Sequence, residues 1–149
     1  MPGPFSRILH PTDFSPASAA ALASALALAK AGRAKLVLLH VLTPPSPFVG
    51  DDVVPARTYE ELEAGARRGA RRELARRVAR ARRAGVPAAG VIVDGVAFEE
   101  ITRFAKRKGV DLIVMGTHGR TGLPRLFMGS VAERVLQRAP CSVLTARGK

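Results

Sequence analysis

VDLIVMGTHGRTGLPRLFMGSV, residues Val110–Val131, is the stretch that decides the fold of this chain. It begins with a short apolar run, which is typical of a buried strand. In the loop that follows, Gly116, Gly119, Gly129 and Ser130 have the spacing G-x2-G-x9-G-[ST]. Apolar residues after the loop recur at helical spacing, so the glycines join a strand to a helix. Exposed backbone N–H groups and a helix N-terminus make such a connection suitable for holding an anion.

Outward from this stretch, strand patterns and helix patterns alternate along the whole chain. The expected strands are Phe5–His10, Lys35–Leu42, Ala89–Val93, Val110–Met115 and Cys141–Ala146. The expected helices are Pro16–Ala31, Tyr59–Ala84, Ala97–Lys108 and Ser130–Arg138. This order predicts a single-domain α/β fold, a Rossmann-like doubly wound sheet of five parallel strands with four helices. Ligands of such sheets bind beyond the carboxyl ends of the strands, where the strand order reverses.

Local signals place both ends of the first helix and one face of the second. Ser15 is expected to cap the first helix with Pro16 at its first position, and Gly32 to end it. The second helix has an apolar stripe, which predicts the face that packs on the sheet. The stripe consists of Leu62, Ala66, Ala70, Leu74, Val78 and Ala81. Before this helix, Thr43–Thr58 is too rich in proline for regular structure, and a lid over a ligand or a mobile loop are the two interpretations.

Four segments resemble the ATP-binding branch of the universal stress protein family. They are ILHPTDFS (Ile8–Ser15), LLHVL (Leu38–Leu42), the glycine loop with its flanks (Val110–Leu136) and APCSVLTAR (Ala139–Arg147). The resemblance covers residues 1–149 as one domain. It implies the strand order 3-2-1-4-5, a homodimer through the last strand, Cys141–Ala146, and ATP held across the ends of strands one and four. Mg²⁺ or Mn²⁺ would be bound through the phosphates, and ADP or AMP could replace ATP.

The resemblance also implies a set of nucleotide-binding residues. Pro11, Thr12 and Asp13 would contact the base and ribose, and Val41 would offer backbone hydrogen bonds to adenine. The ribose and phosphates would be held by Met115, Gly116, Thr117, His118, Gly119, Arg120, Thr121, Gly129, Ser130 and Val131. Glycines at 116, 119 and 129 would allow positive φ and a close approach of the backbone to the phosphates, and Arg120 would form charge-assisted hydrogen bonds.

Some of these residues also have an interpretation without a ligand. Ser130 and Glu133 form the S-x-x-E pattern of a capping box, which either only caps the last helix or caps it in the free protein and yields to phosphate. Asp13 could hydrogen-bond its own turn. His40, on an apolar strand, is interpreted as a core histidine with its hydrogen bonds satisfied. No catalytic residue is assigned, because no base–nucleophile pair is visible near His118.

Nine arginines and one glutamate lie within Arg67–Arg83 and account for much of the net charge of +12. They could neutralise phosphates of a nucleic acid. Only one Tyr, six Phe and no Trp occur in the chain, and none lies in this segment, so a stacking platform for bases is absent. A solvated helix face is the simpler interpretation. No membrane partner is expected, and a nucleic acid is the less favoured partner.

Composition places the chain among small proteins with a real core, since 47% of its 149 residues are hydrophobic. No run is apolar enough for a membrane span, and one cysteine excludes an internal disulfide, so we expect a cytoplasmic protein. The absence of Asn and the single Gln fit a thermophilic source or a GC-rich genome. The expected function is a nucleotide-dependent stress-response or signalling module with an unknown protein partner. A slow metal-dependent ATPase and a nucleic-acid binder using the Arg67–Arg83 helix are the alternatives.

Overall fold

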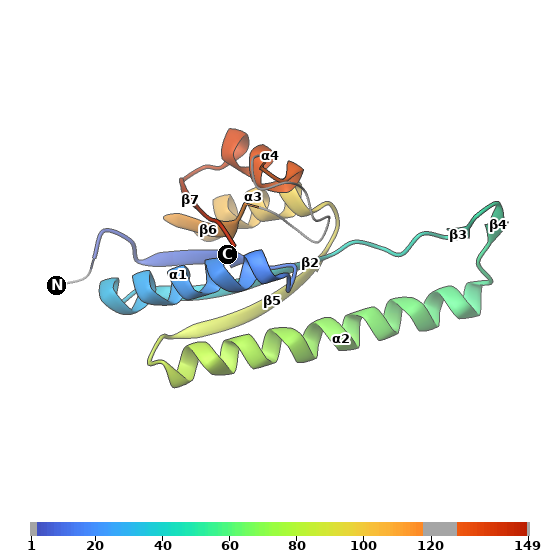
Figure 1. Ribbon diagram of the computed structural model, residues 1–149, viewed down its shortest axis with the longest axis horizontal. Helices are drawn as coiled ribbons and strands as arrows, with labels where there is room; N and C mark the ends of the chain where they lie inside the picture. Colours follow the sequence, from blue (N-terminus) through green and yellow to red (C-terminus); the bar gives the residue numbers. More distant parts are fainter. Residues whose placement is uncertain (1–2, 118–127, 149) are drawn as a thin grey trace.

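A five-stranded parallel sheet forms the centre of the protein, as the computed structural model shows for residues 3–117 and 128–148 (Figure 1). Its strands are β1 (Arg7–Pro11), β2 (Lys35–Leu42), β5 (Ala88–Asp94), β6 (Leu112–Gly116) and β7 (Ser142–Ala146). Their order in the sheet is β5-β2-β1-β6-β7, and all neighbours are parallel. Counted along the chain this is 3-2-1-4-5, so the predicted fold and strand order are confirmed.

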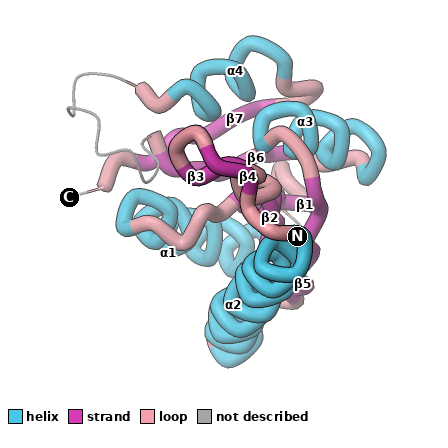
Figure 2. Tube along the Cα trace, turned by 90° about the vertical axis from the view of Figure 1, so that its right-hand side faces the viewer, coloured by secondary structure: helices cyan, strands magenta, loops and turns pink. Residues whose placement is uncertain are grey.

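Two helices cover each face of the sheet (Figure 2). The helices are α1 (Pro16–Gly32), α2 (Ala56–Arg83), α3 (Ala97–Lys108) and α4 (Ser130–Arg138). Ile8 of β1 belongs to the core under α1 and α2, whereas Leu9 belongs to the core under α3 and α4. Because successive side chains of a strand point to opposite faces, a strand buried on both faces must be apolar throughout. The continuous apolar runs of the sequence have this cause.

The predicted start of α1 is confirmed at atomic detail. The Ser15 hydroxyl accepts a hydrogen bond from the backbone N–H of Ser18 at 3.2 Å, and Pro16 is the first helical residue. The predicted end is off by one residue. Gly32 is still helical, and Arg33 adopts the left-handed conformation with φ 54° and closes the helix. Boundary shifts of one or two residues also occur at most strands and reflect ordinary fraying of element ends.

The segment before α2 differs from its prediction. Two short antiparallel strands, β3 (Phe48–Val49) and β4 (Asp52–Val53), pair around Gly50, whose φ of 61° suits a tight turn. Three residues later, α2 begins at Ala56. This hairpin and the first turns of α2 project beyond the carboxyl end of the sheet (Figure 1). Thr43–Thr58 therefore contains regular structure.

Four of the six residues in the predicted apolar stripe of α2 are buried. Ala70, Leu74, Val78 and Ala81 pack against the sheet, but Ala66 is exposed and Leu62 is 51% exposed. The helix is longer than the sheet that it covers, and its first turns have no strand beneath them (Figure 1). Helical periodicity identifies a face, and the length of the neighbouring sheet decides how much of that face is covered.

Candidate functional site

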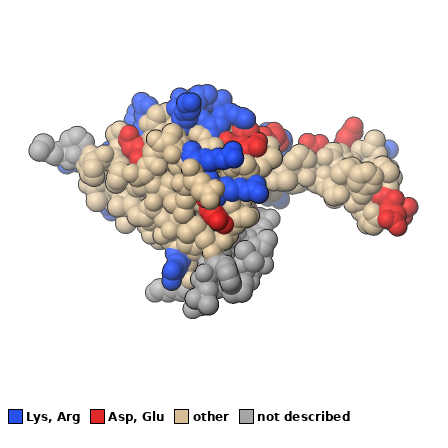
Figure 3. All heavy atoms as spheres, turned by 90° about the horizontal axis from the view of Figure 1, so that it is seen from above, with Lys and Arg blue, Asp and Glu red and all other residues tan. Residues whose placement is uncertain are grey.

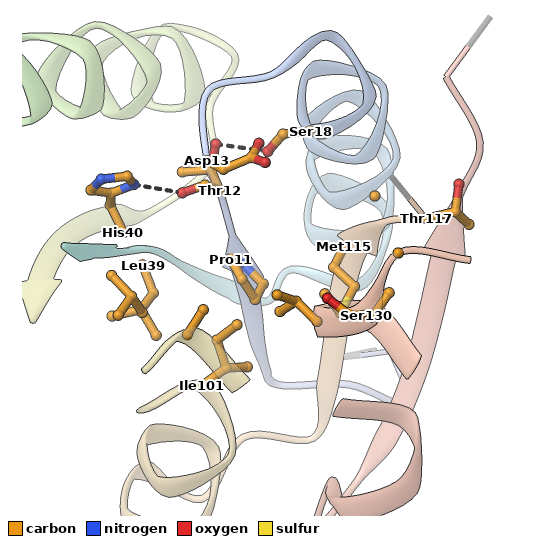
Figure 4. A pocket seen from close by; sticks show the side chains of 16 residues that line it. Pro11, Thr12, Asp13, Ser18, Leu39, His40, Ile101, Met115, Thr117 and Ser130 are labelled. Atoms are coloured by element: carbon orange, nitrogen blue, oxygen red, sulfur yellow. Dashed lines mark hydrogen bonds between the residues drawn. The ribbon is translucent and has the colours of Figure 1, made fainter. Parts of the chain in front are cut away.

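A cavity of about 240 Å³ opens beside the carboxyl ends of β1 and β6 (Figure 4). The chain runs from β1 to β2 and β5 on one side and returns to β6 and β7 on the other, so the strand order reverses between β1 and β6. This is the topological switch point at which doubly wound sheets bind ligands. The cavity therefore lies where the fold predicts a ligand site.

Ten of the fourteen residues predicted to bind nucleotide line this cavity. They are Pro11, Thr12, Asp13, Val41, Met115, Gly116, Thr117, Gly129, Ser130 and Val131. The other four, His118, Gly119, Arg120 and Thr121, lie outside the described residues. The structure thus brings together residues from four separate parts of the chain, while their role as nucleotide ligands stays a prediction.

Six lining residues were not predicted. They are Ser18, Leu39, His40, Ala97, Ile101 and Ala132. Ala97 and Ile101 lie one helical turn apart at the start of α3. The sequence signal that could have identified them is a small residue followed, four positions later, by an apolar one. Leu39 and His40 directly precede the predicted Val41. The described lining contains no residue of Thr43–Thr58, so the lid interpretation of that segment receives no support from the cavity.

Residues 11–18 form a hydrogen-bonded turn at the end of β1. The Thr12 hydroxyl oxygen accepts from the backbone N–H of Phe14 at 3.1 Å and from the Ser18 hydroxyl at 2.7 Å. Oδ1 of Asp13 accepts from the backbone N–H of Ser15 at 2.9 Å. The turn interpretation of Asp13 is therefore confirmed. One carboxylate oxygen can hold a turn while the group keeps further acceptor capacity, so this role is compatible with ribose binding.

An aromatic stack braces this turn from the side of α2. Phe14 has φ 65°, a left-handed conformation that is unusual for a bulky residue. Its ring stacks on His40 with 4.4 Å between ring centroids, and the Arg77 guanidinium lies 4.7 Å from the Phe14 ring centroid on the Phe14 ring face. Nδ1 of His40 donates to the carbonyl oxygen of Thr12 at 2.7 Å, since a carbonyl can only accept. Thr12 is thus held by His40 of β2 on one side and by Ser18 of α1 on the other.

Arg77 is itself held in place by Glu73. The two side chains are joined at 2.7 Å, and the Arg77 side chain is only 19% exposed. The hydrogen bond from Arg77 lowers the pKa of the Glu73 carboxyl. One arginine of the Arg67–Arg83 run therefore has a structural role that composition did not reveal. His40 is hydrogen-bonded as predicted, but it is half-buried and lines the cavity, so the interpretation as a core residue is wrong.

The glycines 116 and 129 do not have the conformation that was predicted for them. Gly129 has φ −60°, and Gly116 also lies outside the positive-φ region. A Cβ on Gly116 would stand 3.0 Å from the carbonyl carbon and oxygen of Ala17, at the start of α1. Gly116 is required because the end of β6 and the first turn of α1 pack in direct backbone contact. The predicted close approach of the backbone at Gly116 is present, and the group that it approaches is the backbone of α1.

The predicted capping box at the start of α4 is also wrong. Gly129 is the N-cap residue, Ser130 is already the first helical residue, and no side chain of the described residues caps the helix. The backbone N–H of Glu133 bonds the carbonyl oxygen of Gly129 at 3.0 Å as an ordinary helical bond. The first N–H groups of a helix have no partner within it. Because Gly129, Ser130 and Val131 line the cavity, the positive end of this helix opens into it.

His10 is fully buried below the cavity, on β1. Nδ1 donates to the carbonyl oxygen of Val114 at 2.9 Å, while Nε2 has no hydrogen-bond partner among residues 3–117 and 128–148. Burial lowers the pKa of this imidazole to about 4, because desolvation disfavours the charged form. His10 is therefore a neutral, hydrogen-bonded core residue.

Two further features concern metals and membranes. In the described part of the chain, no group of three His, Cys, Asp or Glu side chains is placed to hold a metal ion. Within the same residues, no helix combines the length and apolar character that crossing a membrane requires.

Comparison with known proteins gives the family. The family model described as the universal stress protein family matches residues 4–147. The chain belongs to this family. Universal stress protein MJ0531 of Methanocaldococcus jannaschii is 39% identical over 144 residues, which cover 96% of this chain and 82% of that protein.

Solved structures agree with the fold of this universal stress protein. The structure of hypothetical protein MJ0577 of Methanocaldococcus jannaschii superposes with a TM-score of 0.84 at 30% identity, covering 97% of both chains. More distant structures include a universal stress protein in complex with cAMP (TM-score 0.69, 23% identity, 97% and 98% covered). A family protein from Arabidopsis thaliana with AMP bound has a TM-score of 0.70 at 18% identity, with 97% and 92% covered.

Proposed function

We propose that this universal stress protein binds an adenine nucleotide, with ATP as the ligand, in the cavity between β1 and β6. It serves in the cytoplasm as a nucleotide-dependent module of stress response or signalling. Family membership and the adenine nucleotides in two more distant members support the proposal. The site of this chain supports it independently, as the following contacts show.

The observation that carries the proposal is the uncapped start of α4 facing the same cavity as Asp13 (Figure 4). The backbone N–H groups of Ser130 and Val131 supply an anion site, because the helix dipole and these first N–H groups, which no side chain of the described residues caps, both favour phosphate. The N–H of Gly129 instead donates to the carbonyl oxygen of Thr117 at 2.6 Å and fixes the entry to the helix. The carboxylate of Asp13 is an acceptor for ribose hydroxyls. A nucleoside phosphate combines these two chemistries in one molecule.

The rest of the cavity suits a planar, apolar base with a polar edge. Leu39, Ile101 and Met115 provide apolar surface, and Val41 at the end of β2 provides backbone groups for the adenine edge. Mg²⁺ or Mn²⁺ binds together with the nucleotide, because such cations prefer phosphate oxygens and water as ligands. ADP and AMP fit the same base and ribose contacts and differ in how many phosphates reach α4.

Self-association through β7 is part of the same proposal. β7 is an edge strand of the sheet. Leu144 on it and Leu136 on α4 are exposed apolar residues. Edge strands offer unpaired backbone groups that a second copy can pair. A homodimer at this edge would leave the cavity between β1 and β6 open.

Calorimetric titration of nucleotide-stripped protein tests the site. ATP should bind with one site per chain, and Asp13→Asn should lower the affinity by roughly tenfold or more, since hydrogen bonds to charged groups contribute about 1.5–3 kcal/mol. Asparagine keeps the acceptor for the Ser15 N–H, so the turn is preserved. Asp52→Asn on the exposed hairpin is the matched control and should bind like the wild type. Absence of binding at millimolar ATP would refute the proposal.

A further inference from the structure

The projecting part of the chain is both acidic and apolar. We call residues Phe48–Ala66 the arm: it comprises the hairpin and the first turns of α2. Its charged residues are Asp51, Asp52, Arg57, Glu60, Glu61 and Glu63, so its net charge is −4 in a chain of net charge +12. Figure 3 shows acidic side chains on the projection and Lys and Arg side chains over the body of the molecule. Phe48, Val49 and Val53 of the hairpin are 55%, 72% and 69% exposed.

A second feature has the complementary chemistry. A groove of about 450 Å³ runs between α2 and the edge strand β5. Its floor is made by Leu74, Ala75, Val78, Gly90 and Ile92. Two arginines, Arg67 and Arg71, line it as well. Leu74 and Val78 are almost fully buried, so polar groups make up more of the exposed lining of the groove than apolar ones. At its rim Arg67 pairs with Asp94, and Arg71 is exposed. The groove therefore offers a basic rim to the acidic neighbours of the hairpin.

We propose that a second copy of this chain occupies the groove, with the two α2 helices antiparallel about a two-fold axis. The first half of α2 is acidic and its second half is basic. A parallel pair would place like charges together, whereas an antiparallel pair places each acidic half on the basic half of the other copy. Such an interface is self-complementary, which is the requirement for a two-fold dimer.

In this antiparallel arrangement the charged residues of α2 and the hairpin both come opposite their counterparts in the other copy. With the axis near Ala66, residues equally far before and after it lie opposite one another. Glu60 is on the same side of α2 as the groove residues Arg71 and Val78, so it then lies opposite Arg71 of the other copy. The start of α2, about 15 Å from the axis at 1.5 Å per residue, lies opposite residues near Ala75, which line the groove. The hairpin, three residues before α2, then lies over the groove, and this contact covers the exposed apolar side chains of the hairpin.

This interface is independent of the one at β7. β5 and β7 are opposite edges of the sheet, so both associations can form in one assembly. The ion pairs at the rim of the groove are screened by salt, while apolar burial is not. The α2 interface should therefore weaken, without vanishing, as the salt concentration rises.

Charge reversal followed by mixing tests the pairing. The arm variant Glu60→Arg/Glu61→Arg and the groove variant Arg71→Glu/Arg72→Glu change exposed residues of one helix. Light scattering after size exclusion should give each variant half the wild-type mass, because like charges face each other in both. An equimolar mixture of the two variants should regain the wild-type mass, since each arm then meets a groove of opposite charge. The control Glu99→Arg/Lys106→Glu reverses exposed charges on α3 and should keep the wild-type mass.

Val49→Asp provides an apolar test that leaves α2 unchanged. It places a charge at the hairpin and should also halve the mass, with an unaltered circular dichroism spectrum. The proposal would be overturned if the arm variant, the groove variant or Val49→Asp kept the wild-type mass. This is the result expected if the acidic arm binds a different protein instead of a second copy. A mixture that stays at half mass would equally overturn the two-fold pairing. ATP titration of the same samples reports separately on the nucleotide site.

Discussion

Gly116 shows how one missing Cβ joins two elements. A methyl group at this position would stand 3.0 Å from backbone atoms of Ala17, which cannot move without displacing α1. Gly116→Ala should therefore lower the free energy of unfolding by about 1–3 kcal/mol, the usual cost of overpacking. Gly69→Ala in α2 is the matched control, because nothing lies within 4 Å of its new methyl group. That variant should be stabilised by roughly 0.5–1 kcal/mol, as alanine is the better helix former. Urea unfolding measures both, and equal effects would contradict the backbone contact.

His10 makes stability depend on pH. Its pKa is lowered from 6.5 to about 4 by burial, so between these values the unfolded chain binds a proton that the native chain does not. The ionisation of His10 therefore does not reduce the free energy of unfolding above pH 6.5. It lowers the free energy of unfolding progressively as the pH falls from 6.5 towards 4. The full loss is about 3 kcal/mol, from roughly 1.4 kcal/mol per pKa unit.

Urea unfolding of the wild type between pH 7 and pH 4 should show this slope, and His10→Gln, which keeps a donor for Val114, should flatten it. A nuclear magnetic resonance titration of the imidazole gives the pKa directly. A His10 signal that titrates near 6.5 would show that the ring is not buried in the neutral form.

At the scale of elements, the two serines that precede or begin helices have different roles. Ser15 caps α1 through its hydroxyl, whereas Ser130 makes no capping bond to α4. Ser15→Ala should cost about 1 kcal/mol of stability. Ser130→Ala should leave the melting temperature of the nucleotide-free protein unchanged. If both substitutions destabilise the free protein equally, Ser130 caps its helix and the open anion site at α4 is disproved.

The contact between α2 and the Phe14 ring couples two elements at the candidate site. Arg77 and Arg76 both bind Glu73, but Arg77 lies over Phe14 while Arg76 is 74% exposed. Arg77→Gln removes the cation–π contact and loosens the turn that holds Asp13, so ATP affinity should fall several-fold. Arg76→Gln should leave the affinity unchanged. Calorimetric titration distinguishes them, and identical affinities would show that the stack does not position the turn.

The Arg67–Arg83 run is not uniformly a solvated face. Arg67 pairs with Asp94, Arg77 packs on Phe14, and Nε of Arg82 donates to the carbonyl oxygen of Ala88 at 3.0 Å. These arginines tie α2 to β5 and to the end of β1. Part of the positive charge of this run is therefore neutralised within the domain, whereas Arg71 beside the α2–β5 groove is exposed.

For the whole molecule, the two edges of the sheet are expected to act separately. Leu144→Glu places a charge on the exposed face of β7, where a second copy would have to pack, and should abolish the β7 dimer. Association through α2 should survive this substitution, so the variant would retain a two-fold assembly. Sedimentation velocity gives the mass. A variant with wild-type mass would show that β7 is not an interface.

The sequence by itself determined the order of elements, the sheet topology through its resemblance, and the ten described residues that meet at the cavity. These features depend on local patterns: apolar runs make buried strands, Ser15 and Pro16 start a helix, and strand ends collect at one edge of a parallel sheet. Only the tertiary structure decided the stack of Phe14, His40 and Arg77, the helix contact at Gly116, the absence of a cap at Ser130 and the projection of the arm. Each of these depends on which backbone lies beside another and on how far a helix outruns its sheet, and periodicity along one segment carries no information about either.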